Sequence, residues 1–180
     1  TYLCCSSGFF YFTASASPFI VWRPQGCLRG MTGIKIVCVG RVKEDFFRDG
    51  IAAYVKEIRK KYSMDIMECP DEPTPDQCPA SVERQIREME GERILSKIKD
   101  DDYVIALCID GKHYSTSAWK KRMERVFSTV SSDVVFVIGG SLGLADKVVR
   151  RANEKLSFSA LTFPHQMMRL ILCEQIARIV

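Results

Sequence analysis

Residues 134–143 read VVFVIGGSLG, and this stretch decides how the chain folds. Its first five residues are apolar and rich in β-branched side chains, which predicts a strand buried on both faces of a sheet. Gly139, Gly140 and Gly143 follow at once, and glycines let a backbone approach a ligand closely because no Cβ intervenes. Ligands of open α/β sheets bind beyond the carboxyl ends of the strands. We therefore expect a binding site at this loop, with a simple tight turn as the alternative.

Strand-like and helical patterns alternate on both sides of this stretch. Apolar periodicity predicts further strands at residues 34–39, 64–68, 103–109 and 155–158, and helices at residues 45–62, 82–98, 116–130, 145–152 and 165–180. Such alternation predicts an α/β fold with one mainly parallel sheet and helices on both of its faces.

Local signals refine these boundaries. Ser81 is the candidate N-cap of the second helix, and Ser115 or Ser117 that of the third. The prolines within residues 70–79 predict a loop, and residues 110–112 predict a turn. The segment before that turn is apolar throughout, so its strand should be central.

The composition is that of an ordinary globular protein. The 180 residues are 47% hydrophobic and 27% charged, enough for one domain with a core. The formal net charge of +4 is too small to indicate a nucleic-acid-binding protein by charge alone.

Residues 1–30 differ from the rest of the chain. They are rich in aromatic and small residues and contain no Asp, Glu or Lys. A signal peptide places its positive charges before the apolar part, whereas Arg23 and Arg29 come after it, and Pro18 interrupts the apolar part. We expect an extension outside the fold, followed by a single domain over residues 31–180.

The eight cysteines do not form a metal-binding or disulfide pattern. No C-x-x-C pair is present, and this scatter favours reduced, structural cysteines in a cytosolic protein. The two histidines, His113 and His165, are not at ligand spacing, so we expect no metal site.

A second candidate ligand segment is residues 156–165, which read LSFSALTFPH. A strand runs here into a loop of small and apolar residues without Lys or Arg. Such a loop offers backbone N–H and C=O groups to a neutral heterocycle such as adenine, and suits a phosphate poorly. The alternative is a connection buried for packing. His165 begins the next helix, where capping or positioning is favoured over proton transfer.

The last helix is apolar on nearly every face, so it should be central or lie at a subunit interface, with the interface favoured. Basic residues cluster at 120–125 and 147–151. Such clusters are typical of solvated helix faces, with phosphate contact as the alternative. Neither a P-loop nor a G-x-G-x-x-G motif is present.

Several of these segments resemble one family. The similar motifs are VIGGSLG at 137–143, LSFSALTFPHQMMR at 156–169 and EQ at 174–175, with IVCVG at 36–40 and EGERIL at 90–95. They resemble the RlmH family, which are SPOUT-class methyltransferases of large-subunit ribosomal RNA. The resemblance covers residues 33–180.

The resemblance implies properties that sequence patterns do not show. It implies a trefoil knot at the C-terminal end of the α/β fold. Knots are rare among protein folds, so sequence patterns alone would not predict one. It also implies a cytoplasmic homodimer that uses S-adenosylmethionine to methylate N3 of a pseudouridine in 23S ribosomal RNA on the ribosome. Carried over by position, the cofactor-binding residues are Leu107, Gly139, Phe158, Ser159, Ala160, Leu161, Thr162 and Phe163. His165 and Arg169 are the catalytic candidates, Arg169 as an electrostatic or RNA-contacting group.

The chain departs from the family pattern in three places. It ends at Val180, where family members continue and finish with a Tyr-His pair, and Ala177 replaces a usual tyrosine. Residues 1–30 have no counterpart. We therefore expect a domain truncated at its C-terminus, in which cofactor binding survives better than turnover. The alternatives are a non-catalytic RNA- or ribosome-binding module of the same fold, and a flavodoxin-like nucleotide- or phosphate-binding domain.

Overall fold

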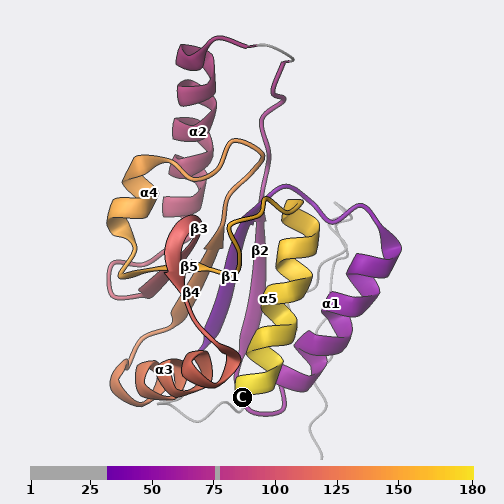
Figure 1. Ribbon diagram of the computed structural model, residues 1–180, viewed down its shortest axis with the longest axis vertical. Helices are drawn as coiled ribbons and strands as arrows, with labels where there is room; N and C mark the ends of the chain where they lie inside the picture. The colour runs from indigo at the N-terminus through magenta and orange to yellow at the C-terminus, as the bar shows by residue number, and fades with distance from the viewer. Residues whose placement is uncertain (1–31, 76–77) are drawn as a thin grey trace, which may run out of the picture.

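The computed structural model describes residues 32–75 and 78–180. Strands and helices alternate along this part of the chain (Figure 1). They are β1 (Ile34–Val39), α1 (Asp45–Ile58), β2 (Met64–Cys69), α2 (Ala80–Leu95), β3 (Tyr103–His113), α3 (Thr116–Thr129), β4 (Val134–Ile138), α4 (Asp146–Arg151), β5 (Glu154–Ser157) and α5 (His165–Ile179). The prediction about residues 1–30 lies outside the described residues.

The five strands form one sheet in the order β2-β1-β4-β3-β5. Every neighbouring pair is parallel, which confirms the predicted α/β fold. The VVFVI strand, β4, is the middle strand, and all five of its residues are buried. Each such buried Val, Ile or Phe stabilises the fold by about 1.5–3 kcal/mol relative to an exposed one. The trefoil knot stays a prediction from the family resemblance.

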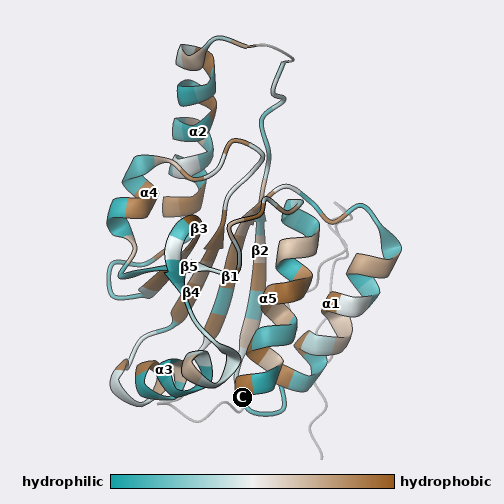
Figure 2. Ribbon diagram, viewed as in Figure 1, coloured by the Kyte–Doolittle hydropathy of each residue, from teal (hydrophilic) through white to brown (hydrophobic). Residues whose placement is uncertain are grey.

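Helices cover both faces of the sheet, as predicted. Successive side chains of a strand point to opposite faces. Phe136 belongs to the face that packs against α1, α3 and α5, whereas Val135 and Val137 belong to the face that packs against α2 and α4. Figure 2 shows the resulting pattern, with apolar residues on the strands and polar residues on much of α2.

The turn predicted at residues 110–112 is wrong as stated, because β3 continues to His113. Leu156 of β5 pairs with Leu107 and again with Lys112, so the residues between them bulge out of the ladder. A Cβ on Gly111 would lie 2.5 Å from the carbonyl carbon of Leu156. The close approach of β5 therefore requires glycine there. β3 is paired on both sides, as its apolar run predicts.

The predicted helix caps had mixed outcomes. The backbone N–H of Ala118 donates to Ser115 Oγ at 3.3 Å, which confirms the Ser115 cap of α3. The Ser81 cap is wrong, because α2 begins at Ala80, two residues before the predicted start, and its N-cap residue Pro79 makes no side-chain cap. Proline fixes its own φ near the value that a helix start accepts.

Helix α5 lies beside α1 and packs on the sheet (Figure 1). Its inward residues Leu172, Cys173 and Ile176 are fully buried, while Met167 is exposed on its outer side. The helix thus covers the sheet, and a subunit interface on its outer side stays a prediction.

Candidate functional site

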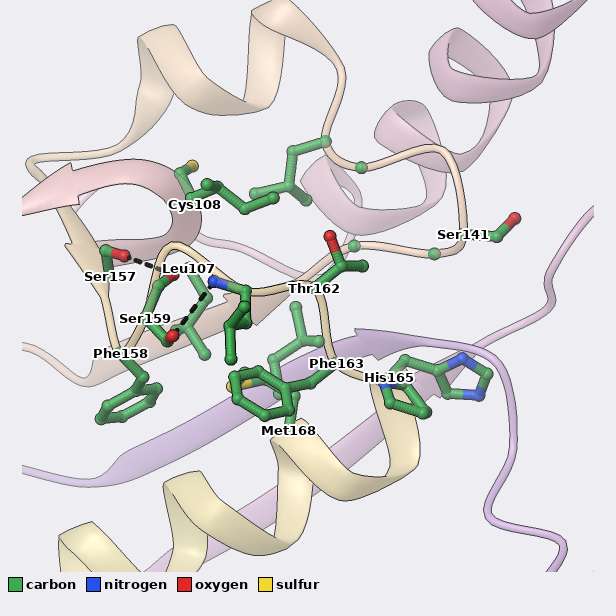
Figure 3. Close-up of a pocket in the computed structure, with 18 of the residues that line it drawn as sticks. Leu107, Cys108, Ser141, Ser157, Phe158, Ser159, Thr162, Phe163, His165 and Met168 are labelled. Carbon is green, nitrogen blue, oxygen red and sulfur yellow. Dashed lines mark hydrogen bonds between the residues drawn. The ribbon is translucent and has the colours of Figure 1, made fainter.

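A pocket of about 610 Å³ opens at the carboxyl ends of the strands. Three segments surround it (Figure 3): the end of β3 at residues 107–109, the loop after β4 at residues 138–144, and the β5–α5 connection at residues 156–165. Met168 on the first turns of α5 closes one side. The two segments singled out by sequence, although separated along the chain, line the same pocket.

Most of the predicted cofactor-binding residues line this pocket. They are Leu107, Gly139, Phe158, Ser159, Leu161, Thr162 and Phe163. Ala160 belongs to the same loop, but it is exposed and does not line the pocket. Among the catalytic candidates, His165 lines the pocket and Arg169 does not.

The loop after β4 is both a tight turn and a pocket wall. The backbone N–H of Gly143 donates to the carbonyl of Gly140 at 3.1 Å, and Gly143 has a φ of 81°, a conformation that costs other residues free energy. A Cβ on Gly139 would lie 2.8 Å from the carbonyl carbon of Gly143. The loop is therefore a tight turn that also lines the pocket, and ligand binding there stays a prediction.

Hydroxyl groups shape the β5–α5 connection. Ser157 Oγ donates to the carbonyl of Ser159 at 3.1 Å, and Ser159 Oγ accepts from the backbone N–H of Leu161 at 3.0 Å (Figure 3). No Lys, Arg, Asp or Glu is among the described residues that line the pocket. An uncharged lining of this kind suits a heterocycle and disfavours a phosphate, which counts against the flavodoxin-like alternative.

His165 lies against Gly40 at the edge of the pocket. Gly40 has a φ of 82°, and a Cβ there would lie 2.8 Å from His165 Nε2. The imidazole edge that carries Nε2 is thus packed against backbone, which favours positioning over proton transfer. The glycine that ends β1 was visible in the sequence, but its contact with a residue 125 positions later was not.

Arg169 is buried behind the pocket, with only 1% of its surface exposed. Its Nη1 lies 2.5 Å from Glu68 Oε1, and its Nη2 lies 3.0 Å from the carbonyl oxygen of Gly40. A group that contacts RNA must reach the surface, so this placement counts against the RNA-contacting role of Arg169, and its electrostatic role stays a prediction. Glu68 carries no distinctive signal in the sequence, because it alternates with apolar residues in β2 as any outward-facing residue would.

The basic clusters are partly occupied by structural contacts. Arg122 pairs with Glu154 at 2.9 Å, and Lys147 lies 3.0 Å from both Glu88 and Glu92. Arg151 donates to backbone carbonyls of the α2–β3 connection. These contacts engage the three side chains within the fold, which counts against phosphate contact by them.

Within residues 32–75 and 78–180, no group of three or more His, Cys, Asp and Glu side chains is arranged to hold a metal ion. Within the same residues, no helix has the length and apolar character needed to span a membrane.

Comparison with known proteins decides the family. Residues 32–180 match the family model described as "Predicted SPOUT methyltransferase". The chain is 47% identical over 145 residues to the "Ribosomal RNA large subunit methyltransferase H" of Streptococcus thermophilus, across 81% of this chain and 91% of that protein. The protein of the same name from Lactobacillus delbrueckii subsp. bulgaricus is 48% identical over the same shares.

The chain belongs to the RlmH family of SPOUT methyltransferases. The resemblance drawn from the glycine loop and the LSFSALTFPH segment is thereby confirmed. Among solved structures, the "Crystal Structure of Probable Methyltransferase from Bordetella pertussis Tohama I" overlaps this RlmH-family chain with a TM-score of 0.49 at 8% identity, over 82% of this chain and 94% of that one.

Proposed function

We propose that this protein transfers a methyl group from S-adenosylmethionine to N3 of a pseudouridine in 23S ribosomal RNA. The observation that carries the proposal is the 610 Å³ uncharged pocket, lined by the glycine loop and the β5–α5 connection. The names of its relatives, which are large-subunit ribosomal RNA methyltransferases, support the substrate class.

The residues of the pocket fit the proposed methyl donor. The glycine loop forms a cradle, because a Cβ on Gly139 would occupy the space beside Gly143. Backbone groups of residues 158–163, together with Leu107, would hold adenosine and methionine between apolar walls. When bound, S-adenosylmethionine supplies an electrophilic methyl group on a positively charged sulfur.

The chain itself would contribute mainly positioning. Methyl transfer requires the attacking atom in line with the transferred carbon, so holding both groups in place supplies much of the rate. His165 borders the pocket and rests on Gly40, where it would orient the substrate. Arg169 would act indirectly, because its contacts with Glu68 and Gly40 hold the first turns of α5.

A homodimer and the ribosome belong to the same proposal. Met167 is 37% exposed on the outer side of α5, and Phe46 is 65% exposed at the start of the adjacent α1. A second copy of the chain would cover apolar surface of this kind. The assembled ribosome would supply the RNA substrate.

Calorimetry tests the donor pocket. Gly139→Val should weaken S-adenosylmethionine binding by about tenfold or more, because its side chain would collide with the Gly143 backbone. The matched control is Ala53→Val, an exposed position on α1 that does not line the pocket, which should leave binding unchanged. Equal binding by wild type and Gly139→Val would contradict the assigned pocket.

Methyl incorporation tests the reaction. Ribosomes that lack the modification should accept labelled methyl groups from the donor, and the label should map to N3 of a pseudouridine. Donor and ribosome binding without incorporation would instead support a non-catalytic binding module.

A further inference from the structure

Glu90 of α2 is a buried carboxylate that lies behind the glycine loop of the pocket. Its residue surface is only 4% exposed. A Cβ built on Gly140 would lie 3.0 Å from Glu90 Oε2 and 3.2 Å from Oε1. Gly140 lines the pocket. Its backbone therefore separates the Glu90 carboxylate from the pocket, and no side chain of Gly140 adds to that separation.

The contacts of Glu90 within residues 32–75 and 78–180 do not neutralise it. Its hydrogen bond in this part of the chain comes from the backbone N–H of Glu72, at 3.2 Å. Arg93, one turn further along α2, pairs with Glu72 instead and donates to the carbonyl of Pro70 at 3.0 Å. Burial raises the pKa of the Glu90 carboxyl above its ordinary value, although the backbone N–H of Glu72 and the charge of Arg93, which does not pair with it directly, act in the opposite direction.

A buried charge without a cationic partner is costly, and a nearby positive charge relieves that cost. The pocket wall does not supply a positive charge from Lys or Arg, since neither is among its described lining residues. A cationic ligand can supply that charge. The low dielectric constant of a partly enclosed site makes such an attraction stronger than it would be in water.

We propose that Glu90 recognises the positive charge of the methyl donor through the backbone of Gly140, and thereby favours the cationic donor over its neutral demethylated product. S-adenosylmethionine carries a sulfonium, whereas S-adenosylhomocysteine carries an uncharged thioether and differs from the donor only by the missing methyl group and its charge. The inference rests on the proposed function, because it concerns the same pocket. It assigns Glu90, which does not touch the ligand, a positioning and charge-recognition role.

This role has a kinetic consequence. The sulfonium loses its charge as the methyl group leaves, so attraction to Glu90 stabilises the bound donor more than the transition state. Such an interaction lowers the KM for the donor and helps expel the product, but it does not raise kcat. Replacing Glu90 should therefore raise the KM for the donor and leave kcat unchanged or slightly higher.

The test compares two ligands on the full chain by calorimetry. In Glu90→Gln, the Kd for S-adenosylmethionine should rise on the order of tenfold, while the Kd for S-adenosylhomocysteine should change by less than about twofold. The matched control is Glu92→Gln, an exposed carboxylate on the same helix that pairs with Lys147. It should change neither affinity.

The outcomes separate this inference from the proposed function. Parallel weakening of both ligands in Glu90→Gln, or no change in either, overturns the inference and leaves the donor pocket standing. A wild-type protein that binds neither ligand overturns the proposed function, and the inference with it. Thermal unfolding checks that the variant folds. If the variant does not fold, the two affinities of the wild type provide the test. A wild type that binds the neutral product more tightly than the donor also overturns the inference.

Discussion

Arg169 on α5 and Glu68 on β2 form an ion pair across 101 residues of sequence, with Nη1 2.5 Å from Oε1. The arginine side chain is 1% exposed and that of Glu68 is 29% exposed. Glu68 Oε1 also accepts from the backbone N–H of Val42 at 3.2 Å. The pair therefore ties the first turns of α5, where His165 borders the pocket, to the ends of β1 and β2.

Arg169→Met should destabilise the protein, because it leaves the Glu68 carboxylate and the Gly40 carbonyl without their donor. Breaking a buried pair from one side costs about 3–5 kcal/mol. The partial exposure of Glu68 reduces the expected loss to about 2–3 kcal/mol. Denaturant unfolding measures this loss directly.

The control for this pair is Arg178→Met, since Arg178 is an exposed arginine on the same helix that pairs with Glu174 four residues earlier. It should cost less than about 0.5 kcal/mol. The double variant Arg169→Met with Glu68→Met should recover part of the stability. A single-variant loss no larger than that of Arg178→Met would show that the buried pair does not stabilise the fold.

Gly143 and Gly139 of the pocket loop should differ in their response to alanine. At Gly143 a Cβ meets nothing within 4 Å, but φ is 81°, so Gly143→Ala should cost only the strain of that conformation, about 1–2 kcal/mol. Gly139→Ala should lower the free energy of unfolding further and weaken donor binding, because its Cβ would lie 2.8 Å from the carbonyl carbon of Gly143. Denaturant unfolding and calorimetry on both variants check this order, and the reverse order would contradict the loop geometry.

Acid should weaken an ion pair at the opposite end of the sheet. Lys35 Nζ lies 2.6 Å from Asp133 Oδ2, and the backbone N–H of Gly33 donates to Asp133 Oδ1 at 3.0 Å. Burial alone would raise the pKa of the Asp133 carboxyl, but the hydrogen bond and charge of Lys35 outweigh it and hold this pKa below its ordinary 3.8. A lowered pKa contributes stability above the ordinary value that is lost as pH falls through the folded value.

The free energy of unfolding should therefore decrease as the pH falls below about 4. Asp133→Asn should remove the share of this decrease that comes from protonation of Asp133. At pH 7 the variant should be less stable by about 1–2 kcal/mol, because the Lys35 ammonium loses its nearer partner and keeps Asp102, at 3.6 Å. Unfolding curves at several pH values, compared between wild type and variant, measure both effects. Parallel curves across this range would contradict the role of the pair.

Ser115→Ala should remove the N-cap of α3 and destabilise the protein by about 1 kcal/mol, because the N–H of Ala118 loses its side-chain acceptor. Ser117→Ala, two residues further along, is the control and should have a smaller effect. Thermal unfolding of both variants gives the comparison. Equal effects would mean that the cap contributes no more than the neighbouring hydroxyl.

Sequence patterns alone predict the order of elements and both loops that line the pocket. A buried strand such as residues 134–138 is recognisable because apolar, β-branched runs have few other stable conformations. The glycines after it, and the uncharged β5–α5 connection, are local signals as well. Their meeting in one pocket follows from the parallel sheet, in which the carboxyl ends of the strands lie along one edge.

The contacts of the charged residues, in contrast, become apparent only in the folded chain. Arg169 and Glu90 occupy ordinary positions in their sequence patterns, and their roles depend on Glu68 and Gly140, which neighbour them in space and not along the chain. The extension of β3 past Gly111 depends in the same way on the approach of β5. Helices and strands follow from the local spacing of apolar residues, which the sequence displays directly. The burial and pairing of a charged side chain instead depend on which distant segments the fold packs against it.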